Sequence, residues 1–330
     1  MEIPINSNPE GKKYILTDHT CQVEGHTLYR IRALKDFAGV RAGELGGYVA
    51  GEHNLAQYGN CWICNNAIVY ENATVKDNAR VSDFAVIRGN AHVTGDSSVS
   101  ESAHISGYVR LSDYSSVFGN ANLCGNVSLS DDAIVSGDAR ISGNVALHGE
   151  SLVCGFAKLT DNVSLYNDAE CEISGNVRLY DQSSVKDFAR ISDNVVLFNK
   201  SSVAGHAQLS GNVMMSETSS ICDYAQAKDN AKLKDACYVH GYVKLSGDCD
   251  ISGCANLAGN VQIRKKGKIS GNAVLTGNIC VTENAKINGD VTLSGDTIVK
   301  GDSHISTQEQ AQSLRCQLIN QNNIESTKKI

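Results

Sequence analysis

From Leu45 onward, the sequence repeats a pattern of six residues. Three successive units read VYENAT at 69–74, VKDNAR at 75–80 and VSDFAV at 81–86. The first position is nearly always Leu, Ile or Val, the fifth is small, and the third and fourth are rich in Gly, Asp and Asn. A helix would repeat its apolar residues every 3.6 positions, and a lone β-sandwich would not keep a six-residue period for so long. The pattern therefore predicts a solenoid.

Each position of the unit has a physical role. The first and fifth positions point inward, and the second and sixth point outward, as in any strand. The third and fourth turn a corner, where Gly, Asn and Asp tolerate left-handed backbone angles. Three units close one coil of 18 residues, as at 111–128, 129–146 and 147–164. The prediction is an all-β fold, a single-stranded parallel β-helix of about 14 triangular coils.

The regular pattern covers 45–305, so the chain divides into three predicted regions. Residues 1–44 are expected to form a small N-terminal β cap that covers the first open sheet edge. Residues 306–330 are expected to form a short capping helix and a tail, because Thr307 and Gln310 have the spacing of a capping box. Ala311, Leu314 and Leu318 would share one face of that helix.

The period is broken once, in the segment LYNDAECEISGNVR at 165–178. A deletion of four residues explains the break, because it keeps Asn162 above Asn176 in one corner column. The missing corner would leave a dent in the coils, and this dent is a candidate groove.

Composition limits the partners and the compartment. The chain has 330 residues and a net charge of −7, which gives no indication of nucleic-acid or anionic-membrane binding. No apolar run approaches the roughly 20 residues that span a bilayer. The N-terminus lacks the apolar core of a signal peptide, and the 12 Cys show no framework spacing. These features predict a cytoplasmic protein of bacterial or phage origin.

One predicted corner column is aromatic. It carries Phe156, Phe188, His206, Tyr224 and Tyr242, the last four in consecutive coils. Stacked rings can simply replace corner hydrogen bonds, but an exposed strip of rings also favours binding. The strip is therefore a candidate surface for a protein partner or for a second copy in a homo-oligomer.

Three residues near this column are candidates for acid–base or nucleophilic catalysis: His206, His240 and Cys222. The alternative is that they are ordinary residues of a flat, wet face. The basic run Arg264, Lys265, Lys266 and Lys268 is either a solvated face or a phosphate contact. Cys61 and Cys64 have C-x-x-C spacing, but one points inward and the other outward, so no metal site is predicted.

The repeated unit resembles the hexapeptide repeat of left-handed parallel β-helices, the fold of many bacterial acyl- and acetyltransferases. The segments DFAGVRAGELGGYV at 36–49 and YGNCWICNNAIVYENA at 58–73 look like the YdcK-like family of bacterial and phage proteins. The resemblance covers roughly 36–305. It implies left-handed coils and, for an enzyme, a His base and an acyl-coenzyme A substrate, which the basic run could contact.

Two functions remain open. The favoured one is a non-catalytic scaffold that presents flat faces and the aromatic corner to a partner, with no required cofactor. It is favoured because hexapeptide transferases commonly extrude a loop to build a pocket, and no insertion interrupts 45–305. The alternative is an acyl- or acetyltransferase that uses acetyl-coenzyme A.

Overall fold

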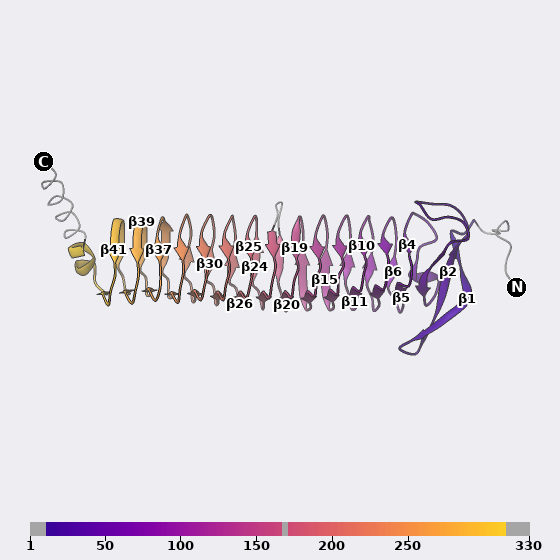
Figure 1. The fold of residues 1–330 in the computed structure, drawn as a ribbon, viewed down its shortest axis with the longest axis horizontal. Coiled ribbons are helices and arrows are strands. Elements are labelled where there is room, and N and C mark those ends of the chain that lie inside the picture. Colours follow the sequence, from indigo (N-terminus) through magenta and orange to yellow (C-terminus); the bar gives the residue numbers. More distant parts are fainter. Residues whose placement is uncertain (1–10, 167–170, 315–330) are drawn as a thin grey trace. The chain divides into compact units, whose positions relative to one another are not determined.

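The computed structural model describes residues 11–166 and 171–314. The chain divides into two compact units, Met1–Glu170 and Cys171–Ile330. Each unit is built from short parallel strands in coils that follow one another along the chain (Figure 1). The all-β solenoid predicted from the six-residue pattern is confirmed. Residues 167–170, at the break in the period, lie outside the described residues, and so does Leu318 of the predicted capping helix.

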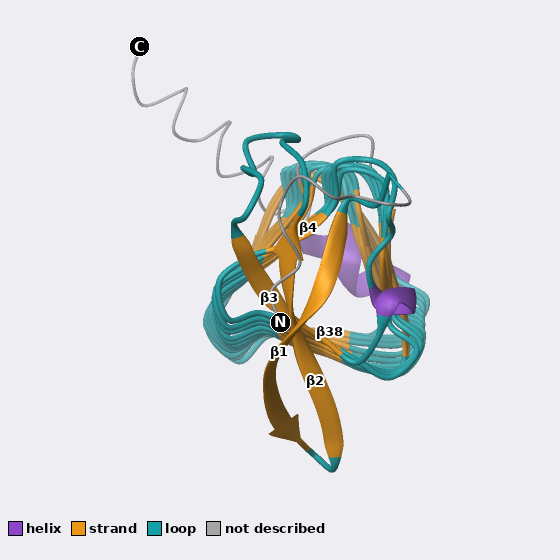
Figure 2. Ribbon diagram, turned by 90° about the vertical axis from the view of Figure 1, so that its right-hand side faces the viewer, coloured by secondary structure: helices purple, strands orange, loops and turns teal. Residues whose placement is uncertain are grey.

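The first unit opens with an antiparallel cap. Strand β1 (Tyr14–Val23) pairs with β2 (His26–Ala33), and β2 pairs with β3 (Leu45–Val49). Strand β3 then pairs in parallel with β5 (Ile68–Val69), so it joins the cap to the coils. The β1–β2 hairpin projects away from the coils (Figure 2).

The coils of the first unit have three faces, each named after its first strand. The β3 face continues through β5, β8 (Val86–Ile87), β11 (His104–Ile105), β14 (Asn122–Leu123), β17 (Arg140–Ile141) and β20 (Lys158–Leu159). The β4 face contains β4 (Trp62–Ile63), β7 (Arg80–Val81), β10 (Ser98–Val99), β13 (Ser116–Val117), β16 (Ile134–Val135) and β19 (Ser151–Val153). The β6 face follows the short 3₁₀ helix η1 (Glu52–Asn54) and contains β6 (Thr74–Val75), β9 (His92–Val93), β12 (Arg110–Leu111), β15 (Asn126–Leu129), β18 (Asn144–Leu147) and β21 (Ser164–Tyr166).

The second unit repeats this plan with its own three faces. The β23 face contains β23 (Arg178–Leu179), β26 (Val196–Leu197), β29 (Met214–Met215), β32 (Lys232–Leu233), β35 (Asp250–Ile251), β38 (Lys268–Ile269), β40 (Lys286–Ile287) and β42 (His304–Ile305). The β24 face contains β24 (Ser184–Lys186), β27 (Ser202–Val203), β30 (Ser220–Ile221), β33 (Tyr238–Val239) and β36 (Asn256–Gly259). The β25 face contains β22 (Cys171–Ile173), β25 (Arg190–Ile191), β28 (Gln208–Leu209), β31 (Gln226–Ala227), β34 (Lys244–Leu245) and β37 (Gln262–Ile263). Strands β39 (Val274–Val281) and β41 (Thr292–Val299) each continue from the β24 face to the β25 face.

The core follows the predicted positions. Val69 and Val75, at first positions, and Ala73 and Ala79, at fifth positions, are completely buried. Each buried Val contributes about 1.5–3 kcal/mol of transfer free energy. A large and a small side chain alternate inward along each coil, so the narrow interior fills without large aromatic residues.

The corners explain why Asp replaces Gly at so many third positions. Asp77 has φ 59°, in the left-handed region, which disfavours most side chains. Its Oδ2 accepts the backbone N–H of Gly95 in the next coil at 3.2 Å. The Asp side chain therefore gains a bond between coils that offsets part of its backbone strain.

The C-terminal end is covered as predicted by a helical segment at 308–314. Thr307 Oγ1 accepts the N–H of Gln310 at 3.3 Å, and Gln310 Oε1 accepts the N–H of Thr307 at 3.2 Å. These two bonds form the capping box. Gln308 bonds both the N–H and the C=O of Thr292, at 2.8 and 3.1 Å, and so covers part of the edge of β41.

Candidate functional site

His240 and Cys222 occupy equivalent positions in adjacent coils of the second unit. Cys222 directly follows β30 and His240 directly follows β33, and the register pairs Ile221 with Val239. Both side chains therefore leave the same column of the β24 face. The register therefore places Cys222 next to His240 in the stack of coils.

Three residues surround this pair, and we call all five the His240 cluster: Cys222, Asp223, Tyr238, His240 and Asn256. The rings of Tyr238 and His240 stack with centroids 4.6 Å apart and 23° between their planes. The Tyr238 hydroxyl lies 3.3 Å from Cys222 Sγ. His240 Nε2 lies 3.2 Å from Asn256 Oδ1. Because that oxygen can only accept, the contact assigns the proton to Nε2.

The other ring nitrogen of His240 faces a carboxylate. Nδ1 lies 3.7 Å from Asp223 Oδ2, too far for a hydrogen bond but within range of a charge interaction. Asp223 is itself held by the backbone N–H of Gly241, which donates to the same oxygen at 2.9 Å. The His240 side chain is 28% exposed, so the ring is supported on three sides but still reachable from solvent. The arrangement suits a group that takes up a proton at Nδ1, because Asp223 would stabilise the imidazolium.

The Tyr238 hydroxyl and the Cys222 thiol, which lie near His240, stay protonated at neutral pH. The hydrogen bond to Cys222, followed by burial, raises the pKa of Tyr238 to about 12. Burial raises the pKa of the Cys222 thiol, and the Tyr238 hydroxyl only partly opposes this effect. A thiol rather than a thiolate is a poor nucleophile, so the geometry gives Cys222 a hydrogen-bonding role.

The His206 ring does not join the His240 cluster, although its backbone N–H donates to Asp223 O at 2.6 Å. It belongs to a continuous stack at the corner between the β24 and β25 faces, which we call the aromatic ladder: Phe188, His206, Tyr224 and Tyr242. Successive ring centroids are 4.6, 4.8 and 5.2 Å apart and the rings are nearly parallel. The ladder rings show mainly their edges to solvent, because their faces cover one another. Phe156 is 67% exposed and stacks on no other ring among the described side chains, so it is not counted in this ladder.

A groove lies at the next corner of the second unit, where the β25 face meets the β23 face. Its volume is about 470 Å³, and we call it the lysine groove; it is lined by Asn212, Asn230, Lys232, Asp248, Asp250 and Lys268. Lys234 Nζ contacts Asp250 Oδ2 at 3.2 Å, which balances one carboxylate. Lys232 and Lys268 form no ion pair among the described residues, so their ammonium groups are available to an anionic ligand.

The predicted basic run does not act as one patch. Arg264 donates to Gln262 on the β25 face, and Lys265 Nζ lies 3.7 Å from Glu283 Oε1. Lys266 lies at the corner between the β25 and β23 faces, and only Lys268 lines the groove. Within the described part of the chain, no group of three or more His, Cys, Asp or Glu side chains could hold a metal ion. No helix in that part is long and apolar enough to cross a membrane.

Sequence reasoning missed Tyr238, Asn256 and Asp223. A signal was present, because a sixth-position side chain lies on the same side of its strand as the second-position side chain two residues later. Tyr238 and His240 have this spacing, and in its column Tyr238 follows Ser184, Ser202 and Ser220.

Parts of this chain resemble two proteins that are described as transferases. No protein-family model matches the chain. A protein described as the uncharacterized acetyltransferase YdcK of Escherichia coli (strain K12) is 43% identical over 63 residues, which span 19% of this chain and 19% of that protein. The structure of a Francisella novicida UDP-N-acetylglucosamine acyltransferase covers 64% of this chain and 62% of its own, with 14% identity and a TM-score of 0.16. That likeness is too slight to support an inference. The non-catalytic scaffold favoured by the sequence receives no support from these comparisons.

Proposed function

We propose that this chain, a YdcK-like hexapeptide-repeat solenoid, is an acyltransferase that moves an acyl group from acyl-coenzyme A to a hydroxyl or amine acceptor. The observation that carries the proposal is the setting of His240. Its Nε2–H is fixed by Asn256, and its Nδ1 faces Asp223. The similarity to a protein described as an acetyltransferase agrees with this reaction class.

In the proposed reaction, His240 acts as the general base. Its Nδ1 takes the proton from the acceptor as the acceptor oxygen or nitrogen attacks the thioester carbonyl. The carbon–sulfur bond then breaks, and coenzyme A leaves as the thiol after it takes up a proton. Asp223 stabilises the intermediate imidazolium, and the protonated hydroxyl of Tyr238 can donate a hydrogen bond to the developing oxyanion.

The lysine groove is the proposed contact for the phosphates of the donor. Along one coil, the chain passes from His240 across the β25 face through Lys244 and reaches Asp248 at the groove. One side of a coil is six residues, or roughly 20 Å. A donor with its phosphates at Lys232 and Lys268 would lay its extended arm along the β25 face and bring its thioester towards His240.

The test is release of coenzyme A thiol from acetyl-coenzyme A, followed with a panel of amine and hydroxyl acceptors. His240→Gln should lower kcat about a hundredfold or more, because the base is lost. Lys268→Glu should instead raise KM about tenfold, because a charge-assisted contact becomes repulsive. His304→Gln is the matched control, since His304 Nε2 lies 3.0 Å from Asn288 Oδ1 but has no carboxylate or tyrosine contact among the described residues.

Two outcomes would contradict the proposal. One is wild-type protein that neither binds nor turns over acetyl-coenzyme A with any acceptor. The other is turnover that His240→Gln and His304→Gln lower to the same extent.

A further inference from the structure

Lys13, directly before β1, has an unusual environment for a lysine. The residue is 1% exposed. Its Nζ donates to the backbone oxygens of Cys61 at 2.9 Å and Tyr58 at 3.2 Å, and it lies 5.2 Å from the ring centre of Phe37. Among the described residues no carboxylate contacts this nitrogen, although buried ammonium groups usually have an ionic partner.

The amine also contacts a sulfur atom. Lys13 Nζ lies 3.2 Å from Cys61 Sγ, and Cys61 is completely buried at the start of the first β4-face coil. The other contacts of this sulfur are longer, at 3.8 Å to the backbone oxygens of Ala56 and Tyr58. An amine and a thiol are therefore held together in a site from which water is excluded.

The site makes the amine of Lys13 easier to deprotonate than that of a lysine in water. Burial lowers the pKa of the Lys13 ammonium, an effect that the nearby Cys61 partly opposes. A neutral amine keeps a lone pair on its nitrogen, whereas an ammonium has none.

We propose that Lys13 and Cys61 are a modification site, in which dioxygen joins Nζ to Sγ through one oxygen atom. One amine, one thiol and one O₂ give an N–O–S bridge and one water. The nitrogen loses one of its two hydrogens and the sulfur loses its only hydrogen. These two hydrogens leave in the water, and the nitrogen keeps the other one. Nitrogen and sulfur each give up two electrons, and these four electrons reduce the two oxygen atoms.

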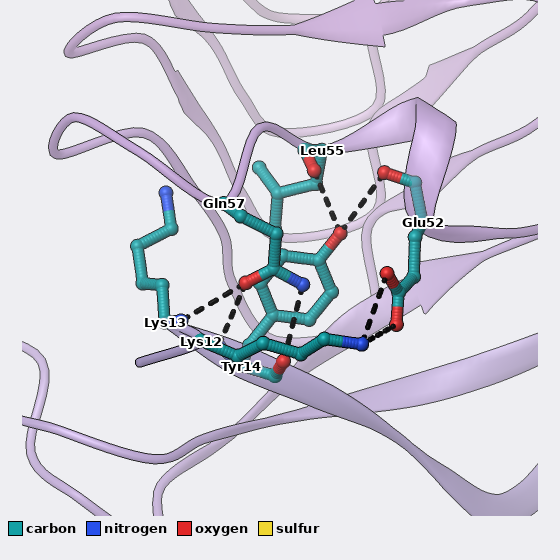
Figure 3. A network of polar contacts seen from close by, with 6 residues as sticks. All are labelled: Lys12, Lys13, Tyr14, Glu52, Leu55 and Gln57. Carbon is teal, nitrogen blue, oxygen red and sulfur yellow. Dashed lines mark hydrogen bonds and ion pairs between the residues drawn. The ribbon is translucent and has the colours of Figure 1, made fainter. Parts of the chain in front are cut away.

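The bridge would lock the N-terminal cap onto the coils. Lys13 is already part of a polar network in which Gln57 Oε1 accepts its backbone N–H at 2.9 Å, Tyr14 donates its hydroxyl to Leu55 O at 2.7 Å, and Lys12 pairs with Glu52 at 3.1 Å (Figure 3). A covalent link from Lys13 to Cys61 would close a loop across this network and raise Tm by a few degrees through the unfolded state. Reduction would release the cap.

The experiment compares full-length protein kept in oxygenated buffer with protein kept anaerobic and reduced. Intact mass should rise by about 14 Da, one oxygen gained and two hydrogens lost, and fall back on treatment with dithiothreitol. Peptide mapping should place the gain on a cross-link between the peptides that contain Lys13 and Cys61. Lys13→Arg and Cys61→Ser should each abolish it, whereas Cys249→Ser, which removes another buried thiol, should leave it unchanged.

Other masses would overturn the proposal. A gain of about 16 Da on Cys61 would indicate a sulfenic acid, and a loss of about 2 Da would indicate a direct N–S bond. An unchanged mass, or the same gain of about 14 Da in Cys61→Ser, would also overturn it. The wild-type measurement does not depend on whether either variant folds.

Discussion

The hydroxyl of Tyr238 lies 3.3 Å from Cys222 Sγ, and the two groups belong to adjacent coils of the second unit. The contact, followed by burial, raises the pKa of Tyr238 to about 12. Burial raises the pKa of Cys222, which stays a thiol at neutral pH. A residue selected from the sequence as a nucleophile is therefore buried in a way that suppresses nucleophilic attack, and the Tyr238 hydroxyl only partly opposes this effect.

At neutral pH, Cys222 should react with iodoacetamide about tenfold more slowly than the exposed Cys254, because the thiolate is the reactive form. Tyr238→Phe removes the one hydrogen bond that lowers the pKa of Cys222, so the pH midpoint of labelling should move upward. Mass spectrometry of labelled peptides at several pH values gives both results. A downward midpoint would show that Tyr238 stabilises the thiol instead.

The alkaline stability of the protein should depend on two other thiols. Burial raises the pKa of Cys237 and of Cys249 to about 12 each. Unfolded thiols lose their protons from about pH 8.5, so the free energy of unfolding should fall between that pH and about 12, by about 1.4 kcal/mol per pH unit for each thiol.

The double variant Cys237→Ala/Cys249→Ala should therefore lose stability less steeply over this range, whatever its stability at pH 7. Urea titrations at several pH values measure how steeply the free energy of unfolding falls with pH. Cys254→Ala, which removes an exposed thiol, is the control. Equal slopes for the double variant and the wild type would contradict the assignment.

The amide column at the groove corner should contribute measurable stability. Asn212 donates to Asn230 at 2.9 Å, and Asn230 donates to Asp248 at 2.8 Å. Asn230→Ala should cost about 1 kcal/mol of unfolding free energy. Asn230→Asp should cost more at pH 7, because it places two carboxylates together, and should recover as they are protonated near pH 4. Failure to recover would show that the column does not depend on this charge contact.

The aromatic ladder should also stabilise its corner. Tyr224 stacks on His206 and on Tyr242, so Tyr224→Ser removes two ring contacts and should cost about 1–3 kcal/mol. Phe84→Ser is a useful comparison, because Phe84 is 64% exposed and contacts no other ring among the described residues. Chemical denaturation should show a larger loss of unfolding free energy for Tyr224→Ser than for Phe84→Ser.

The sequence also predicted that this ladder mediates association between copies. Replacing both Tyr224 and Tyr242 with Ser should then lower the mass measured by light scattering. An unchanged mass would leave the ladder with a purely structural role.

The fold could be predicted almost completely because each position of the six-residue unit has a single physical task. Val69 and Ala73 are buried, and Asp77 turns a corner, as their positions require. The site was less predictable because its bonds are diagonal. Cys222 with Tyr238, and His240 with Asn256, are each 16 residues apart, not the 18 that stack directly. Such contacts depend on side-chain rotamers, which the repeat does not specify. The groove likewise needed Lys232, Asp250 and Lys268 in one column, which forms only when the coils stack.

The bonds between corner side chains join residues 18 apart, as in Asn194 to Asn212. This has a consequence for how such a gene can change in length. Gain or loss of one whole coil by unequal recombination would leave every remaining ladder paired. A change of another size would put carboxylates, rings and amides into the wrong columns, unless it is confined to one corner, as the shortened segment at 165–178 is. Relatives of this protein are therefore expected to differ in length mainly by multiples of one coil.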